Sequence, residues 1–299
     1  MPAPRPAAVD VALMAVGVVG VSMSGPLMAA MAAPALAVAF WRNALGTAAI
    51  LPVAALGHRA AMRRLTFGEL RLIGVAALAL AVHFATWVSS LRLTSVAAAT
   101  ALVSLQAGWV VLLAWARGER PSAGVGVGLA LCLLGVVVVT GVDVTVSAEA
   151  LLGDVLALVG GVAAAVYVLV GGTVRQRTDT TVYTLLCYGT CAVVLLAACV
   201  VSGSALGGYD AADWWRLLGV TVAAQLLGHS VFNHLLDTVS PTVVSLVILL
   251  EVPGAALLAG WFLGQSPQWG IYVGLVLLLA GLAVVVAVRR ETPAETVPD

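Results

Sequence analysis

The sequence predicts an all-α integral membrane protein with ten transmembrane helices, arranged as two inverted five-helix repeats. Composition is the first reason: 62% of the residues are hydrophobic, 9% are charged and the mean hydropathy is +1.10, which is too apolar for a soluble globule. The second is an internal repeat, in which residues 83–141 match residues 229–287 without a gap. The third is that breaks in apolarity leave segments of about 20 residues, the length that crosses a bilayer.

The expected helices are separated by short breaks with local stop and start signals. Residues 118–121 (GERP) and 264–267 (GQSP) each end one helix and place proline in the first turn of the next, and Ser240 before Pro241 begins another. In order, the ten helices are expected at residues 9–30, 34–56, 69–90, 95–116, 122–141, 151–171, 180–202, 213–234, 241–263 and 268–288.

The internal repeat keeps a constant offset of 146 residues. Two halves with an odd number of spans each must lie in the membrane in opposite orientations, which is the construction of many secondary transporters. We therefore expect a first repeat over residues 1–145, a second over 146–290 and a cytoplasmic tail over 291–299. The matched residues are His83 with His229, Gly108 with Gly254, Trp115 with Trp261, Gly118 with Gly264, Pro121 with Pro267, Gly124 with Gly270, Gly128 with Gly274 and Gly135 with Gly281.

The basic residues predict the orientation. All 14 are arginine, and 11 of them fall on one side of the expected topology, as the positive-inside rule requires. Both termini are therefore expected in the cytoplasm of a multi-pass plasma-membrane protein. The arginines on that side are Arg5, Arg59, Arg63, Arg64, Arg71, Arg117, Arg120, Arg175, Arg177, Arg289 and Arg290.

The first apolar segment superficially resembles a signal peptide, since one arginine precedes it and small residues follow it near Ala30. Residues 10–18 nevertheless match residues 154–162 at an offset of 144, through an Asp-Val pair and a Gly-Val pair. Cleavage would leave the second repeat without a partner helix, so we expect the segment to be retained.

The four cysteines, at positions 132, 187, 191 and 199, lie in apolar segments without the flanking histidines that a zinc site needs. Cys187 and Cys191 share a helix face, which leaves a weak metal or redox interpretation, but small packing residues are the favoured one. We expect no metal, no cofactor and no nucleic-acid partner.

GxxxG spacing occurs in the fifth and tenth expected helices, through Gly124 with Gly128 and Gly270 with Gly274. This spacing lets helices approach closely in a bilayer. Packing within each five-helix lobe is the favoured interpretation, and a homodimer contact is the alternative.

Glu251 lies near the middle of the ninth expected helix, where an ionised carboxylate costs about 2.5–3.5 kcal/mol. Pro253 removes a backbone donor two residues later and is expected to kink the helix, which is tolerated at this depth only in buried or cavity-lining backbone. Glu251 can exchange a proton as the site opens to either side, or it can be a protonated group that stabilises the kink. The repeat partners of these residues are Leu105 and Ala107, so the first lobe lacks the feature.

Further polar residues cluster on three other expected helices. Gln225, His229 and Asn233 recur every four residues and form one polar face, and His83 and Trp87 hold the corresponding places in the first repeat. The fourth helix adds Ser104 and Gln106. These side chains are interpreted as the wall of a substrate or ion pathway, with interhelical hydrogen bonding as the alternative.

Arg42 follows Phe40 and Trp41 at the outer end of the second expected helix. The favoured interpretation is an interfacial anchor whose long side chain extends toward water. Attraction of an anionic substrate is the alternative.

Ser22 and Ser24 in the first helix raise a different class of function, a membrane-embedded hydrolase in which a serine is activated by His83 or His229. The chain contains neither G-x-S-x-G nor H-E-x-x-H. An enzyme is therefore the alternative, not the expectation.

The chain resembles the EamA-type permeases of the drug/metabolite transporter superfamily over residues 9–288. The resemblance rests on the span 2 sequence Phe40-Trp41-Arg42-Asn43, the exit of span 4 at Gly118-Glu119, and Glu251 with Pro253; Gln265 stands where the second copy would carry a glutamate.

The resemblance implies an inverted-repeat bundle whose central cavity is lined by spans 1, 3, 4, 6, 8 and 9. It also implies secondary transport of a small amino-acid-like or drug-like metabolite by alternating access, commonly as export. Proton coupling through Glu251 is a further expectation, and no P-loop is present for ATP-driven transport.

Overall fold

The computed structural model describes residues 8–116, 118, 122–141, 147–264 and 269–291, and this described part is helical throughout its regular structure. Seven of its helical segments are long and apolar enough to cross a membrane. They are Ala8–Ala29, Ala35–Gly57, Phe67–Ser90, Val96–Leu113, Ala148–Arg175, Thr180–Ser202 and Pro241–Leu263. The chain is therefore built as a multi-pass membrane protein.

The helices of the first half follow the expected segments closely. In order they are α1 (Ala8–Ser22), α2 (Ser24–Ala29), α3 (Ala35–Gly57), α4 (Arg59–Arg63), α5 (Phe67–Ser90), α6 (Val96–Ser104), α7 (Gln106–Ala116) and α8 (Ala123–Gly141). The short helix α4 lies in the arginine-rich connection between α3 and α5, where no helix was expected.

The second half begins with the longest helix, α9 (Ala148–Arg175). It continues with α10 (Thr180–Ser202), α11 (Ala211–Val220), the π-helix η1 (Thr221–His229), α12 (Ser230–Leu235), α13 (Pro241–Ile248), α14 (Glu251–Leu263) and α15 (Trp269–Glu291). Elements α11, η1 and α12 follow one another without a break and occupy the segment expected as a single helix at 213–234.

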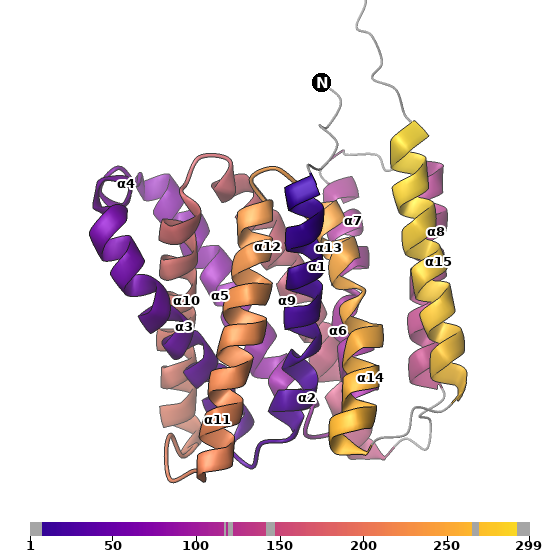
Figure 1. The fold of residues 1–299 in the computed structure, drawn as a ribbon, viewed down its shortest axis with the longest axis horizontal. Coiled ribbons are helices and arrows are strands. Elements are labelled where there is room, and N and C mark those ends of the chain that lie inside the picture. Colours follow the sequence, from indigo (N-terminus) through magenta and orange to yellow (C-terminus); the bar gives the residue numbers. More distant parts are fainter. Residues whose placement is uncertain (1–7, 117, 119–121, 142–146, 265–268, 292–299) are drawn as a thin grey trace, which may run out of the picture.

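The helices stand side by side, and elements from the two halves of the chain alternate in space (Figure 1). Helix α5 packs along α9, α3 along α10, α1 against η1, and α8 along α15. Each of these pairs joins a helix of the first half to one of the second. The α8–α15 pair forms one edge of the bundle, and α3 with α4 forms the opposite edge (Figure 1).

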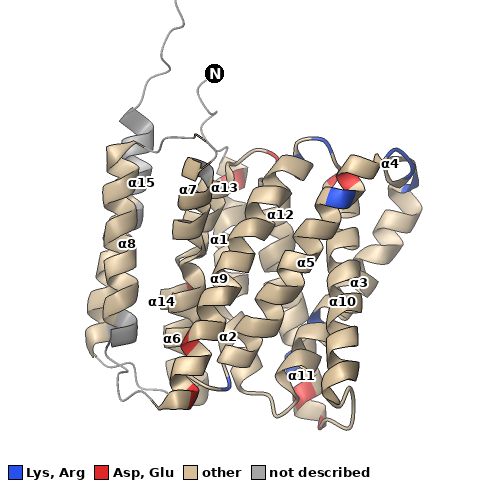
Figure 2. Cartoon of the chain, turned by 180° about the vertical axis from the view of Figure 1, so that it is seen from behind, with Lys and Arg blue, Asp and Glu red and all other residues tan. Residues whose placement is uncertain are grey.

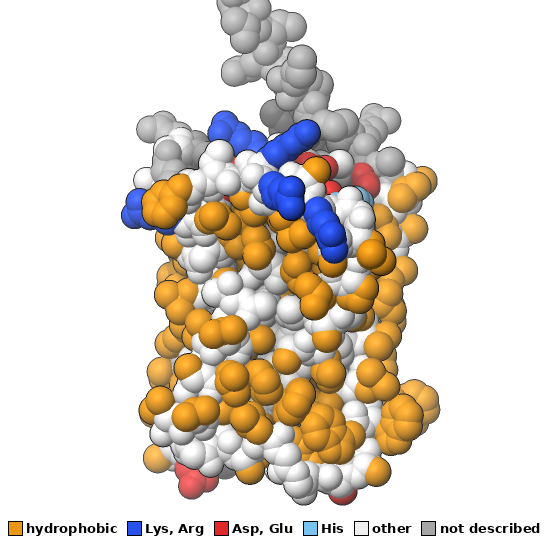
Figure 3. All heavy atoms as spheres, turned by 90° about the vertical axis from the view of Figure 1, so that its left-hand side faces the viewer, with side chains coloured by type: hydrophobic (Ala, Val, Ile, Leu, Met, Phe, Trp, Pro, Cys, Tyr) orange, Lys and Arg blue, Asp and Glu red, His pale blue; other side chains and the backbone are white. Residues whose placement is uncertain are grey.

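The surface is apolar along the length of the bundle and charged at its ends. Large apolar side chains such as Leu56, Val193 and Val201 are exposed on its flanks, and Figure 3 shows arginine side chains gathered at one end. Most of the remaining charged residues also lie toward the ends (Figure 2). An apolar belt between two charged ends is the surface that a bilayer requires.

Side-chain caps fix where several helices begin. Thr66 and Glu69 form a reciprocal capping box at the start of α5, and Ser95, Ser147, Asp179 and Ser240 accept backbone hydrogen bonds at the starts of later helices. The cap at Ser240 with Pro241 in the first turn agrees with the start expected from the sequence.

The contact between α8 and α15 corrects the expectation for Gly128, which was predicted to pack within its own lobe. A Cβ atom added to Gly281 of α15 would lie 2.5 Å from the carbonyl oxygen of Gly128 and 2.8 Å from the backbone nitrogen of Cys132, both on α8. Gly128 and Gly281 thus bring together the two halves of the chain. Glycine is needed at position 281 because the backbone atoms of α8 cannot move aside as a flexible side chain can.

We predict that Gly281→Ala destabilises the protein by about 1–3 kcal/mol, because the added methyl group overpacks this contact. The measurement is the midpoint of thermal unfolding of the purified full chain in detergent. Gly126→Ala is the matched control on α8, since a Cβ atom there meets nothing within 4 Å. Equal midpoints for the two variants would contradict the assigned contact.

Candidate functional site

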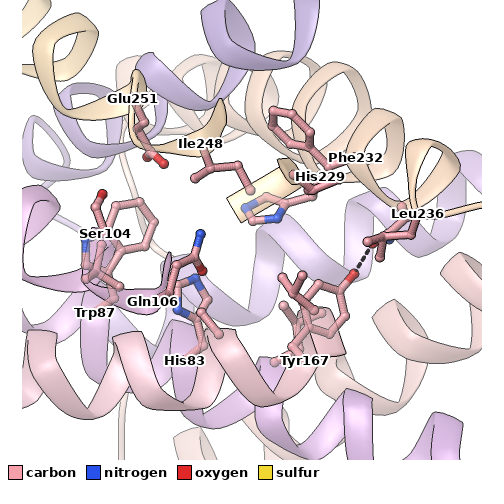
Figure 4. A pocket seen from close by; sticks show the side chains of 16 residues that line it. His83, Trp87, Ser104, Gln106, Tyr167, His229, Phe232, Leu236, Ile248 and Glu251 are labelled. Carbon is pink, nitrogen blue, oxygen red and sulfur yellow. Dashed lines mark hydrogen bonds between the residues drawn. The ribbon is translucent and has the colours of Figure 1, made fainter. Parts of the chain in front are cut away.

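A cavity lies inside the bundle between helices of both halves. Residues from α5, α6, α7 and α9 line one part of it, and residues from η1, α12, α13 and α14 line the other (Figure 4). The cavity is small: the centres of water molecules can occupy a volume of about 30 Å³ in it. This volume holds only a few waters. A molecule larger than a few waters would fit only if the surrounding helices moved apart.

The cavity brings together seven of the eight side chains that were predicted to form a pathway. In Figure 4 the side chains from the first half lie opposite His229 and Glu251 from the second half. The seven are His83, Trp87, Ser104, Gln106, His229, Asn233 and Glu251.

The helix interruption expected from the sequence at Glu251 and Pro253 opens onto this cavity. Between α13 and α14 the chain leaves the helix at Leu249 and Leu250, and the Leu249 carbonyl accepts a hydrogen bond from the Val252 amide at 3.2 Å. Pro253 in the next turn has no N–H to offer that carbonyl. The interruption places Glu251 at the first residue of α14, 7% exposed, on the cavity wall.

The first half has an interruption at the matching place, although it lacks a proline. Helix α6 ends at Ser104 and α7 begins at Gln106, with the Leu105 amide bonded to the Leu102 carbonyl at 3.2 Å. The sequence predicted a helix interruption in the second half alone, because Ala107 occupies the position in the first repeat that Pro253 occupies in the second. The break places Ser104 and Gln106 on the cavity wall beside each other.

The two histidines related by the repeat lie near each other across the cavity. Their ring centroids are 6.4 Å apart, and His83 stacks on Trp87 at 5.6 Å. The Nδ1 atom of His83 is 3.1 Å from the Gly160 carbonyl oxygen of α9, which fixes the orientation of the ring. His229 ends the π-helix η1, and π-helical turns are frequent at functional sites.

Asn233 is held in place by three neighbours. The Tyr167 hydroxyl donates to its Oδ1 atom (Figure 4), its Nδ2 atom donates to Thr184 Oγ1 at 3.4 Å, and its carbonyl accepts from Arg175 Nε at 3.0 Å. Tyr167 lines the cavity and was missed from the sequence, because no polar periodicity on its helix marks it. Asn233 is thus a rigid part of the wall.

Arg42 does not extend to the membrane interface, as was favoured from the sequence, but is completely buried. Its Nε atom donates to Gln225 Oε1 at 2.8 Å, its Nη1 atom donates to Ser24 Oγ at 3.0 Å, and its guanidinium carbon lies 4.1 Å from the centre of the Phe84 ring. These partners lie across the bundle and hold the side chain inside the protein. Arg42 also interacts electrostatically with Glu251, without a salt bridge between the two in the described part.

Gln225, the eighth predicted pathway residue, belongs to this arginine network and does not line the cavity. Besides accepting from Arg42, it donates from Nε2 to Asn43 Oδ1 at 2.9 Å, and its side chain is fully buried. The interhelical alternative raised for the polar face therefore applies to Gln225, while His229 and Asn233 of the same face reach the cavity.

Ser22 and Ser24 are engaged in structural contacts. Ser22 Oγ donates to the Val18 carbonyl at 2.8 Å, and Ser24 accepts from Arg42. Among the hydrogen bonds of the described residues, neither serine has a histidine partner, so the arrangement offers no base for a nucleophilic hydroxyl.

We predict that Gln225→Leu destabilises the protein by about 1–3 kcal/mol, because it removes the acceptor of a buried guanidinium donor. Gln106→Leu is the control: no hydrogen bond of this amide is found in the described structure, and we expect a change within about 1 kcal/mol. Thermal unfolding of both purified variants checks this, and an equal loss for the two would argue against the network.

Comparison with known proteins agrees with this architecture. The model of the EamA-like transporter family matches residues 10–141 and again 151–287. An uncharacterized transporter of Archaeoglobus fulgidus is 23% identical over 204 residues, which cover 68% of this chain and 71% of the relative. A solved structure titled "Crystal structure of protein" matches with a TM-score of 0.73 at 18% identity, covering 94% of this chain and 99% of that one, and so shares the fold. This chain is a member of the EamA-like transporter family.

Proposed function

We propose that this protein is a secondary transporter that exports a small amino-acid-like or drug-like metabolite across the plasma membrane by alternating access. The observation that carries the proposal is the cavity between the two halves of the chain, where polar side chains and an intramembrane carboxyl group converge. Ionisable residues at membrane depth mark substrate and ion pathways. A structural carboxyl group alone does not account for the further polar residues gathered around it.

The proposed topology has ten spans in two inverted repeats with both termini in the cytoplasm. Two matches of the family model, one per half, support the repeat. The gathering of arginine side chains at one end of the bundle supports the orientation (Figure 3). A cavity between two such repeats is where substrates bind in transporters of this construction.

The lining of the cavity supports an amphipathic solute. Trp87, Phe232 and Leu80 offer apolar surface, while Gln106 and Glu251 offer hydrogen-bonding groups. No hydrogen bond of either polar side chain is found within the described residues, so both are available to a ligand. Glu251 can accept from an ammonium or hydroxyl group of the solute, or release a proton when the solute leaves.

Alternating access is supported by the small size of the cavity and by the interrupted helices around it. The breaks at Leu105 and at Leu249–Leu250 divide two wall-forming helices into segments that can tilt separately. Such movement would enlarge the cavity toward one side at a time. The proposed mechanism does not require a homodimer.

We predict that cells producing the native chain shift a specific metabolite from cytosol to medium, and that Glu251→Gln reduces the shift about tenfold or more, since glutamine cannot exchange a proton. Untargeted metabolite analysis of medium and cytosol, at matched membrane levels, measures this. Ser22→Ala is the control and keeps transport. Equal transport by the native chain and Glu251→Gln would refute proton coupling, and loss with Ser22→Ala would favour the hydrolase.

We predict that Ala164→Phe blocks transport, because Ala164 lines the cavity and a phenyl ring would fill its small space. Val162→Phe is the matched control on the same helix, since Val162 is exposed on the outer surface of the bundle. The same metabolite measurement applies to both. Transport that survives Ala164→Phe would place the pathway elsewhere.

A further inference from the structure

A second hollow lies on the outside of the bundle, at the end where the arginines gather. It runs between the first turns of α5 and the last turns of α9, and we call it the α5–α9 groove. Arg71, Leu72 and Val75 of α5 and Gln176 and Arg177 beyond the end of α9 line it. The cavity of the proposed transport pathway is lined by other residues of these two helices, so the groove is not part of that cavity.

The groove holds two positive charges and one negative charge. Arg71 and Arg177 are exposed, and neither guanidinium group forms a hydrogen bond or salt bridge in the described structure. The single carboxylate in the groove, Glu69, accepts from the backbone N–H of Thr66 at 2.8 Å and from its hydroxyl at 2.7 Å in the cap of α5. Its other oxygen accepts from Thr178 Oγ1 at 3.4 Å, and the carboxylate interacts electrostatically with Arg177. Two guanidinium groups against one carboxylate leave the groove with a net positive charge.

An apolar seam continues from the groove toward the middle of the membrane. On α5, Val75 and Leu78 follow Arg71 at helical spacing and are exposed, and on α9 Val162 and Val159 are exposed on the face that also carries Thr173 of the groove. Helices α5 and α9 pack along their length, so the two apolar stripes run together.

We propose that the α5–α9 groove binds an anionic phospholipid of the surrounding bilayer. Its phosphate lies between Arg71 and Arg177, with Gln176 as a further donor, and one acyl chain follows the seam past Val75 and Leu78. Guanidinium groups match phosphate oxygens in charge and geometry, and basic pockets between helices at the membrane surface bind lipid headgroups. A free phosphate would not use the seam.

Such a lipid would touch helices from both halves of the chain, directly behind the cavity wall. His83 of α5 and Tyr167 of α9 lie on the inner faces of the helices whose outer faces form the seam. The lipid would therefore stabilise the contact between the halves in this conformation.

Lipid titration of the purified full chain in detergent tests the proposal. Native mass spectrometry measures binding of dioleoyl phosphatidylglycerol, with dioleoyl phosphatidylcholine and inorganic phosphate as comparison probes. Each arginine near an anionic lipid contributes about fivefold in affinity. Arg71→Ala and Arg177→Ala are each expected to weaken phosphatidylglycerol binding about fivefold, and the double variant about 25-fold.

The matched control is the double variant Arg63→Ala/Arg64→Ala, which removes two exposed arginines near the same end but outside the groove. Retained phosphatidylglycerol binding in this control supports the site, provided that all variants elute as folded monodisperse protein. Equal losses in both double variants, equally tight phosphatidylcholine binding, or competition by millimolar inorganic phosphate would overturn it. The single variants keep the test decisive even where the double variant fails to fold.

Discussion

A bilayer offers no hydrogen-bond partners at depth, and this constraint governs the structure of the bundle. Arg42 shows it most clearly. A charged side chain inside the apolar belt is tolerated because Gln225, Ser24 and the ring of Phe84 surround it. Arg42 comes from the first half of the chain and Gln225 from the second, so the hydrogen bond between them also joins the two halves. The same constraint turns other intramembrane polar groups, such as His83, Gln106 and Glu251, toward the cavity.

Backbone irregularities follow the same rule. The interruptions at Leu105 and Leu249–Leu250 and the π-helix η1 all border the cavity, where freed backbone groups can meet polar side chains or water. Each irregularity also places a polar side chain on the cavity wall: Gln106 begins α7, Glu251 begins α14 and His229 ends η1. The lipid-facing helices α8 and α15 are regular over their described lengths. At these three places, an irregular helix and the cavity wall coincide.

Much of this could be predicted from the sequence, because a polar residue in an apolar helix must face inward whatever its partners are. The four-residue spacing of the polar residues was therefore sufficient to predict that His229 and Asn233 face the cavity. It could not separate them from Gln225 on the same face, since the partner of Gln225 is an arginine 183 residues away in sequence. Arg42 was misplaced for the same reason. The pairing of α8 with α15 and the role of Tyr167 also depend on contacts between distant helices, which no local pattern encodes.

Cysteine accessibility in intact membranes tests most directly whether water and solutes reach the cavity. Gln106→Cys places a thiol on the cavity wall and Val162→Cys places one on the lipid-facing surface, against a background of native cysteines that are all buried. A small, water-soluble, membrane-impermeant methanethiosulfonate reagent is applied to either side of the membrane. The cavity as a transport pathway predicts that Gln106→Cys reacts and Val162→Cys does not. The account would be contradicted if, with the reagent applied to either side of the membrane, the thiol at position 106 were as unreactive as the thiol at position 162.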